Sequence, residues 1–329
     1  MIFSLAITGP TASGKTALSI SLCERLAGEI ISSDSMQIYK RMDIGTAKAT
    51  AEERARVPHH LIDFVDPREN YSVENYRARA IECALDITAR GRVPVFVGGT
   101  GLYVDSLLRA PQTDIPESDP AYRAELLAAI RSEEDAVALW ERLREVDPDS
   151  AEKIHYNNVK RVIRALEIYD RCGITKTELD RRSREPSPEI FVGMITLDFH
   201  DREALYRRID KRVGIMIEDG LLSEVEALYR EGMLPEGSTA AQAIGYKEII
   251  SHLKGECALD EAIEKIKLSS RRYAKRQLTW FRHTAGACTL FVDDERGNMR
   301  DGESVADEAT ELYRRFTEEY RLKYETDGI

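Results

Sequence analysis

The chain has 329 residues, of which 43% are hydrophobic and 32% charged, and its formal net charge is −11 at pH 7. This composition excludes disordered, collagen-like and low-complexity classes, and the acidic total argues against generic binding to nucleic acids or acidic membranes. No apolar run reaches the roughly 18 to 20 residues of a membrane span, and the scattered cysteines form no C-x-x-C pair, so we expect a cytoplasmic protein with neither membrane insertion nor structural zinc.

The first half of the chain alternates strand-like apolar segments with segments of helical periodicity. Residues 2–8 and 29–33 are typical of buried strands, and residues 14–27 between them carry apolar side chains at helical spacing. Such alternation predicts a parallel sheet wrapped by helices, which is an α/β fold. The segments that continue the pattern are predicted strands at 59–65, 93–99 and 191–199 and a predicted helix at 73–91.

The alternation stops between about residues 111 and 190. Prolines open and close this stretch, and amphipathic helical patterns fill it, so we predict a helical insertion. After the last predicted strand, helical patterns lead into an acidic tail. The expected organisation is a catalytic core of residues 1–110 and 191–310, a helical insertion at 111–190 and a C-terminal acidic tail at 311–329.

The strongest local signal is GPTASGKT, Gly9 to Thr16, which matches the pattern G-x-x-x-x-G-K-S/T between a predicted strand and a predicted helix. Its glycines let backbone N–H groups and the helix N-terminus face one anion, while Lys15 adds a positive charge and Thr16 can hold Mg²⁺ through its hydroxyl. The segment predicts a di- or triphosphate site in a P-loop NTPase-like, doubly wound parallel sheet. The alternative is a glycine-rich turn without a ligand, and the pattern does not name the group transferred.

Two further candidates follow predicted strands, at the edge where doubly wound sheets place functional loops. Asp34 follows residues 29–33, where it could be a Mg²⁺ ligand or a general base, or only an N-cap or an Asx turn. Thr100 follows residues 93–99 among glycines, where its hydroxyl could face the same crevice or belong to a simple turn. We expect both residues near the phosphate cradle.

Basic residues gather in three places of this acidic chain. Arg208 and Arg212 share one face of a predicted helix at i and i+4, which an anion between them would explain. Residues 153–184 hold nine Lys/Arg against four Asp/Glu, and residues 265–283 hold seven Lys/Arg and no acid. Aromatic side chains interleave the cations of 265–283, a mixture suited to phosphate contacts and base stacking. Solvated or acid-paired helix faces are the alternative.

Seven ordered blocks of the sequence go beyond a general P-loop signature: GPTASGKT (9–16), EIISSDSMQIYKRMDIGTAK (29–48), VPHHLID (57–63), VGGTGLY (97–103), KRVIRALEIY (160–169), AIGYKE (243–248) and RRYAKRQLTWFR (271–282). Together they resemble the bacterial tRNA dimethylallyltransferase family, the isopentenyl-diphosphate:tRNA transferases. The resemblance covers about residues 1–285 in the order that the family shows.

The resemblance implies transfer of a dimethylallyl group from dimethylallyl diphosphate to N6 of adenosine 37, in the anticodon loop of tRNAs that read codons beginning with U. It also implies Mg²⁺ as the cofactor, a monomer, Asp34 as the general base toward the N6 amino group, and Thr100 as a positioning hydroxyl near the reacting centre. The diphosphate would contact Gly9, Pro10, Thr11, Ala12, Ser13, Gly14, Lys15, Thr16, Arg208 and Arg212, with Thr16 on the metal.

By the same resemblance, the anticodon stem-loop of tRNA lies along residues of both predicted domains, and the insertion grips the stem. Stem recognition would depend on shape and phosphates, and the unpaired loop would supply sequence selectivity. The implied tRNA-binding residues are Asp34, Ser35, Met36, Gln37, Thr100, Arg123, Lys160, Arg161, Val162, Ile163, Arg164, Gln242, Ala243, Ile244, Gly245, Tyr246, Lys247, Arg271, Arg272, Lys275, Arg276 and Gln277.

Three other functions share some of these features. A small-molecule kinase or NTPase would use the same cradle for ATP, with the insertion as its lid. An adenylate isopentenyltransferase would prenylate free AMP or ADP, and a non-catalytic tRNA-binding protein could retain the phosphate loop. The basic segment 265–283 favours a tRNA acceptor over a free nucleotide.

Overall fold

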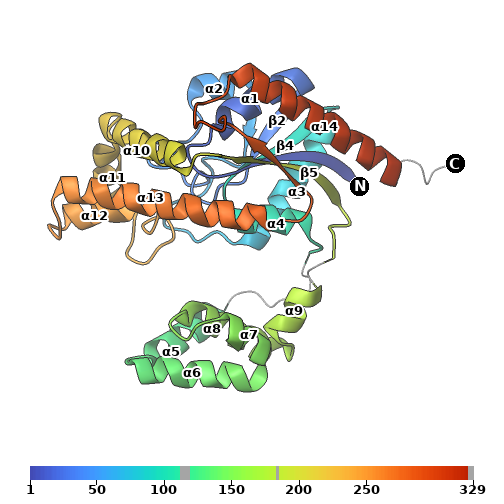
Figure 1. Cartoon of the computed structure of the whole chain (residues 1–329). Coiled ribbons are helices and arrows are strands. Elements are labelled where there is room, and N and C mark those ends of the chain that lie inside the picture. Colours follow the sequence, from blue (N-terminus) through green and yellow to red (C-terminus); the bar gives the residue numbers. More distant parts are fainter. Residues whose placement is uncertain (112–118, 183–184, 325–329) are drawn as a thin grey trace. The chain divides into compact units, whose positions relative to one another are not determined.

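The computed structural model describes residues 1–111, 119–182 and 185–324 of the chain. It divides into two compact units, of which the first comprises Met1–Leu108 with Pro188–Ile329 and the second comprises Arg109–Ser187 (Figure 1). Within the described ranges, no helix combines the length and the apolar character that crossing a membrane requires.

The first unit is built on a six-stranded parallel sheet with the strand order β3-β2-β4-β1-β5-β6. Strand β1 lies between β4 and β5, with β2 and β3 beyond β4 on one side and β6 beyond β5 on the other. This is the arrangement in which doubly wound sheets bind ligands beyond the carboxyl ends of their strands. The predicted α/β, doubly wound fold is confirmed. The strands are β1 (Ile2–Thr8), β2 (Gly28–Ser32), β3 (His59–His60), β4 (Val93–Gly98), β5 (Ile190–Asp198) and β6 (Ala287–Phe291).

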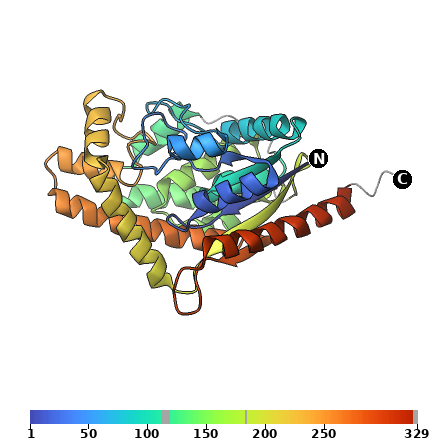
Figure 2. The same cartoon turned by 90° about the horizontal axis from the view of Figure 1, so that it is seen from above.

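Alternating side chains of the central strands feed two apolar cores, one on each face of the sheet. Leu5 and Ile7 of β1 belong to one core, and Ala6 between them belongs to the other. The C-terminal helix α14 lies beside α1 on the first face (Figure 2). That face is covered by α1 (Lys15–Leu26), α10 (Arg202–Glu218) and α14 (Gly302–Tyr324), and the opposite face by α3 (Val73–Ala89) and α4 (Gly101–Leu108).

A third apolar cluster forms where four helices gather at one end of the sheet (Figure 1). It contains Val213 of α10, Tyr246 and Ile266, together with buried residues from the loop that follows β2. This cluster connects loops of the sheet edge to helices far along the chain. The remaining helices of the unit are α2 (Ala51–Arg56), α11 (Leu221–Arg230), α12 (Tyr246–Leu253) and α13 (Leu259–Arg282).

Two strand predictions need correction. The predicted strand at 59–65 ends at His60, because Leu61 and Asp63 have φ angles of 57° and 61°, left-handed conformations that no extended strand contains. Strand β6 at the sheet edge was not predicted, since its five residues give too short an apolar run. The segment predicted as an acidic tail continues α14 as far as Tyr324, and residues 325–329 lie outside the described residues.

The second unit is helical, as the sequence predicted. Capping side chains explain where its first helices begin, because Asp119, Ser132 and Asp147 each accept hydrogen bonds from backbone N–H groups of the first turn. Its small core includes Leu143 of α6 and Leu166 of α8. The helices are α5 (Pro120–Ala129), α6 (Glu133–Val146), α7 (Pro148–Lys153), α8 (Val159–Cys172) and α9 (Lys176–Arg182).

Candidate active site

The phosphate cradle joins β1 to α1 in the first unit. Gly9 and Gly14 have φ angles of 138° and 92°, and a Cβ on Gly9 would lie 2.7 Å from the carbonyl oxygen of Leu197. Only glycine adopts this path without strain, which explains both glycines of the motif. The loop and the first turn of α1, Thr11 to Thr16, line a cavity of about 500 Å³.

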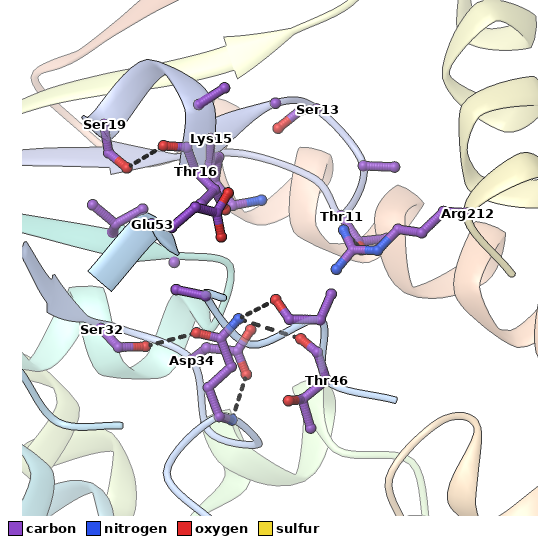
Figure 3. Close-up of a pocket in the computed structure, with 18 of the residues that line it drawn as sticks. Thr11, Ser13, Lys15, Thr16, Ser19, Ser32, Asp34, Thr46, Glu53 and Arg212 are labelled. Atoms are coloured by element: carbon purple, nitrogen blue, oxygen red, sulfur yellow. Dashed lines mark hydrogen bonds between the residues drawn. The ribbon is translucent and has the colours of Figure 1, made fainter. Parts of the chain in front are cut away.

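Lys15 lies in this cavity (Figure 3). Its Nζ donates hydrogen bonds to the carbonyl oxygens of Gly9, at 3.0 Å, and Pro10, at 2.6 Å. Desolvation above all, together with the nearby charge of Arg212, lowers the pKa of Lys15 to about 7, while Asp34 opposes the shift. An anion bound beside the ammonium group would raise this pKa again, because it favours the charged form.

Helix α10 brings two arginines, one turn apart, to the same cavity. Arg208 donates from Nε to the carbonyl oxygen of Ala12 at 2.9 Å, and Arg212 donates from Nη1 to Oγ1 of Thr11 at 3.4 Å. Desolvation lowers the pKa of Arg212 despite the attraction of Asp34, and Arg208 adds to the decrease. In the part of the chain that the structure describes, Lys15 and these arginines form no ion pair. Such cations are typical of an anion site.

The polar groups of the cavity fit a diphosphate with a metal ion. Ser13 Oγ is buried and, among the described residues, accepts or donates no hydrogen bond. Thr16 lines the cavity, and the described ranges contain no group of three or more His, Cys, Asp or Glu side chains that could hold a metal by themselves. A Mg²⁺ ion here would therefore depend on oxygen atoms of its ligand together with the Thr16 hydroxyl, as is usual for Mg²⁺ at phosphates.

Asp34 follows β2 and faces the cradle across the cavity (Figure 3). Its Oδ1 accepts a hydrogen bond from the backbone N–H of Met36 at 2.9 Å and a longer one from Gln37 at 3.4 Å. The Asx turn, which the sequence offered as an alternative to a functional role of Asp34, is therefore present. Since one carboxylate oxygen is fixed by the turn, the whole group is held in one orientation, which suits a base that must meet its substrate at a defined position.

A second cavity of about 310 Å³ adjoins the first. Thr11, Asp34, Thr46, Arg212 and Tyr273 line both, so these residues form the shared wall. The apolar share of the lining is somewhat larger in the second cavity than in the first. Its apolar lining comes from Met36, Ile209, Val213, Met216, Ala243, Ile244 and Ile266.

Thr100 and Gln277 support the loops around these cavities, and Gln277 also lines the first one. Thr100 Oγ1 accepts a hydrogen bond from the backbone N–H of Ser35 at 3.0 Å and lies 3.2 Å from Ser35 Oγ. Gln277 is buried, accepts from the N–H of Thr11 and donates to the carbonyl oxygen of Gly99, both at 2.9 Å. Thr100 thus holds the turn of Asp34, and Gln277 fixes the phosphate loop to the end of β4.

Helix α13 carries the basic segment 265–283. Arg272, Lys275 and Arg276 are exposed and, among the described residues, have no acidic partner, whereas Arg271 pairs with Asp210 at 2.6 Å. Arg276 also lies over the ring of Tyr273, 5.6 Å from its centroid, and lines the second cavity. The helix therefore presents free positive charge beside the candidate site.

The segment Gln242–Lys247 lines the second cavity through five of its six residues. The exception is Tyr246, whose side chain is fully buried and donates a hydrogen bond to Glu224 at 2.5 Å. Gln37, another residue of the predicted tRNA path, spans the first cavity. Its Oε1 accepts from Ser32 and its Nε2 donates to the carbonyl oxygens of Thr46 and Ala47.

In the second unit, the predicted tRNA-binding block divides by exposure. Val162 and Ile163 are buried in the core of the unit, so their side chains are not accessible to a ligand. Lys160 and Arg161 are exposed at the start of α8. The remaining two cations, Arg123 and Arg164, both pair with the fully buried carboxylate of Glu167, at 2.7 and 2.6 Å.

Several cavity residues were not among the predicted site residues, among them Lys211, Glu53 and Tyr273. Lys211 and Glu53 line the first cavity, and Tyr273 lines both. Lys211 lies three residues from Arg208 on the same helix, a spacing that could have revealed it. Glu53 belongs to the capping box of α2, a local role that gave no sign of a position in the cavity.

A parallel α/β core with a phosphate loop after its first strand, and with Lys15, Arg208 and Arg212 in that loop's cavity without ion pairs to any described residue, defines a phosphate-binding enzyme of the P-loop class. A model of the family described as IPP transferase matches residues 37–284, and one described as isopentenyl transferase matches residues 3–62. The chain belongs to the IPP transferase family, and curated relatives that it resembles are named tRNA dimethylallyltransferase.

Individual relatives agree with this assignment. The tRNA dimethylallyltransferase of Halalkalibacterium halodurans is 50% identical over 291 residues, 88% of this chain and 91% of that protein. The crystal structure of the full-length tRNA isopentenylpyrophosphate transferase from Bacillus halodurans has a TM-score of 0.70 at 40% identity, covering 98% of this chain and 100% of that one. A eukaryotic dimethylallyltransferase acting on tRNA gives 0.75 at 31% identity, covering 88% and 74%. The family resemblance of the sequence is confirmed.

Proposed function

We propose that the chain transfers the dimethylallyl group of dimethylallyl diphosphate to tRNA, at N6 of adenosine 37 in the anticodon loop of tRNAs that read codons beginning with U. One observation carries the proposal. A cavity with unpaired cations adjoins a second, more apolar cavity, and Asp34 lies in their shared wall. An anionic donor with an apolar tail and a base acceptor would meet at this wall.

The cradle binds the diphosphate, and its cations stabilise the leaving group. As the bond between the allylic carbon and oxygen breaks, negative charge develops on the diphosphate. Lys15, Arg208 and Arg212 line this cavity and neutralise that charge. Mg²⁺, held by the Thr16 hydroxyl and the diphosphate, would supply further charge neutralisation. The five-carbon tail reaches the wall that the two cavities share, where it meets the acceptor base.

Asp34 accepts a proton from the N6 amino group of the acceptor. That amine is a weak nucleophile, because its lone pair is delocalised into the purine ring, so proton removal and alignment both matter. The Asx turn and Thr100 hold the loop of Asp34 in place. The base must leave its stack to reach the wall between the cavities, as with other enzymes that modify bases.

The tRNA contacts follow from the distribution of free cations. Arg272, Lys275 and Arg276 of α13 bind phosphates near the site, and Lys160 and Arg161 of the second unit bind the stem. The first unit is thus the catalytic core, and the second is a tRNA-binding insertion. This division keeps the chemistry on the sheet and gives the helices of the insertion a recognition role.

Incubation with labelled dimethylallyl diphosphate, Mg²⁺ and an anticodon stem-loop tests the proposal. We expect label on the adenosine 3′ to the anticodon, no label on free AMP, and no phosphate transfer when ATP replaces the allylic donor. Label on AMP instead of RNA, or passage of the terminal phosphate of ATP to an acceptor, would contradict the proposal.

A further inference from the structure

Glu224 of α11 holds a loop that is far from it in sequence. Its Oε2 accepts hydrogen bonds from the backbone N–H groups of Asp43, at 2.9 Å, and Ile44, at 2.8 Å, and its Oε1 accepts one from Gly45 at 3.2 Å. Three successive N–H groups directed at one carboxylate form a small anion-binding turn. The carboxylate of Glu224 thus accepts the hydrogen bonds of all three backbone N–H groups of this turn.

Tyr246 completes this arrangement. Its hydroxyl donates to Oε1 of Glu224 at 2.5 Å, and its ring lies against Gly45, where a Cβ would be 2.4 Å from Cε2 of the ring. Burial raises the pKa of Tyr246 far above its ordinary value, and Glu224 adds to the increase, so the hydroxyl stays protonated as a donor. We call Glu224, Tyr246 and residues 43–45 the loop clamp.

The loop clamp bears directly on the candidate site. Gly45 lines the second cavity, and Thr46, the next residue, lines both cavities. The carbonyl oxygen of Thr46 also accepts from Gln37, whose backbone N–H is bound by Asp34. The clamp therefore holds the wall against which the acceptor base and Asp34 meet.

We propose that Glu224 is a positioning residue that sets the acceptor side of the reaction, by fixing residues 43–45 and thereby the part of the second cavity's wall formed by Gly45 and Thr46. Tyr246 acts with it, as a buried support rather than as a tRNA contact. This inference rests on the proposed transferase function. Glu224 lines neither cavity itself, so any effect on turnover must pass through the loop.

The geometry needs a carboxylate. Four donors share the two oxygens of Glu224, whereas a glutamine would offer one acceptor oxygen and turn its NH₂ group toward another donor. We therefore expect Glu224→Ala to release the loop fully and Glu224→Gln to release it in part. Glu226 on the same helix is the matched control, since Arg230 is its one ion-pair partner among the described residues, at 2.5 Å.

The test is steady-state kinetics with an anticodon stem-loop, together with equilibrium binding of dimethylallyl diphosphate. We expect Glu224→Ala to raise KM for the RNA about tenfold, Glu224→Gln to raise it by a smaller factor, and both to change the affinity for the diphosphate by less than about threefold. Glu226→Gln should match the wild type in all three quantities.

A purely structural role would lower the melting temperature and the fraction of active protein while leaving KM for the RNA unchanged, and that result would overturn the inference. If Glu224→Ala fails to fold, Tyr246→Phe provides the second variant, because it keeps the ring against Gly45 and removes one hydrogen bond. We expect about a threefold rise in KM for the RNA from that variant, and an unchanged KM would contradict the clamp. If the wild type itself transfers no label to RNA, the proposed function fails instead.

Discussion

The two ends of the sheet treat buried charge in opposite ways. At one end, the Glu29 carboxylate of β2 is buried and fully partnered, with Arg90 Nη2 at 2.9 Å, Arg92 at 2.9 Å and His60 Nε2 at 2.7 Å. Arg90 in particular holds the pKa of Glu29 down at about 2. At the other end, beyond the carboxyl end of β1, Lys15 and Arg212 lie in a cavity without acidic partners in the described part of the chain, and desolvation lowers both of their pKa values.

This difference separates charges that stabilise the fold from charges that await a ligand. A partnered buried charge costs stability when its partner is removed, because the remaining charge stays desolvated. A basic group without an acidic partner is desolvated in the free protein, whether it stays charged or loses its proton. Its removal should therefore leave stability intact and weaken ligand binding. Stability and activity therefore respond oppositely at the two ends of the sheet.

Removal of the cradle cation should give the largest effect. We expect Lys15→Met to lower kcat/KM about a thousandfold, because the variant loses the positive charge that neutralises the leaving diphosphate. The melting temperature should stay equal or rise. Kinetics with dimethylallyl diphosphate and a thermal melt measure the two quantities. Lys323→Met, at an exposed position of α14, is the control, and a thousandfold loss accompanied by a large drop in melting temperature would contradict the distinction.

Neutralisation of Asp34 should come next. Asp34→Asn can keep the hydrogen bonds of the turn through its amide oxygen but cannot take up a proton, so we expect kcat to fall about a hundredfold or more. Binding of the stem-loop, measured by fluorescence anisotropy, should stay within about twofold of the wild type. Unchanged turnover would rule out Asp34 as the base.

At the opposite end of the sheet, Glu29→Gln should destabilise the protein by about 3 kcal/mol and leave kcat per folded molecule unchanged. Since the pKa of Glu29 is about 2 in the folded state and about 4.3 when unfolded, its contribution is complete above pH 5 and is lost as the pH falls toward 2. Urea unfolding at pH 7 and at pH 3 should therefore show a smaller difference between variant and wild type at pH 3. An equal difference at both pH values would refute this origin of the stability.

The smallest effect is expected on the exposed cations of α13. Arg276→Ala should weaken stem-loop binding and reduce the slope of log K against log salt by about one, as expected for one lost phosphate contact. Affinity for dimethylallyl diphosphate should stay unchanged. Arg314→Ala, which removes an exposed cation paired with Glu311 on α14, serves as the control, and equal salt slopes for both variants would contradict the placement.

The sequence predicted those parts of the site that are local in the chain. The phosphate loop is one segment of eight residues between a strand and a helix, and its glycines and Lys15 reveal their roles without tertiary information. The central strands were also predicted correctly, since their apolar runs are long enough to recognise. Asp34 was found because it directly follows such a strand.

Contacts between distant segments could not be predicted in this way. Gln277 and Tyr246 belong to motifs of the resemblance, yet their buried positions depend on partners at Gly99 and Glu224. Glu224 belongs to no motif, and only folding brings it to the turn at residues 43–45. The bend at Leu61 was not predicted for a related reason, because an apolar run does not show which of its residues adopt a left-handed conformation.

Calorimetric titration can test whether Lys15 is held without a partner until the diphosphate binds. Dimethylallyl diphosphate is titrated into the wild type and into Lys15→Met, at pH 7.5 in buffers of different ionisation enthalpy. The pKa of Lys15 is about 7 in the free protein, so its side chain is mostly an uncharged amine at this pH. It gains a proton when the diphosphate binds. We expect the wild type to take up at least about half a proton more per site than the variant, and to bind dimethylallyl diphosphate more tightly. Equal proton uptake and equal affinity in the two proteins would contradict it.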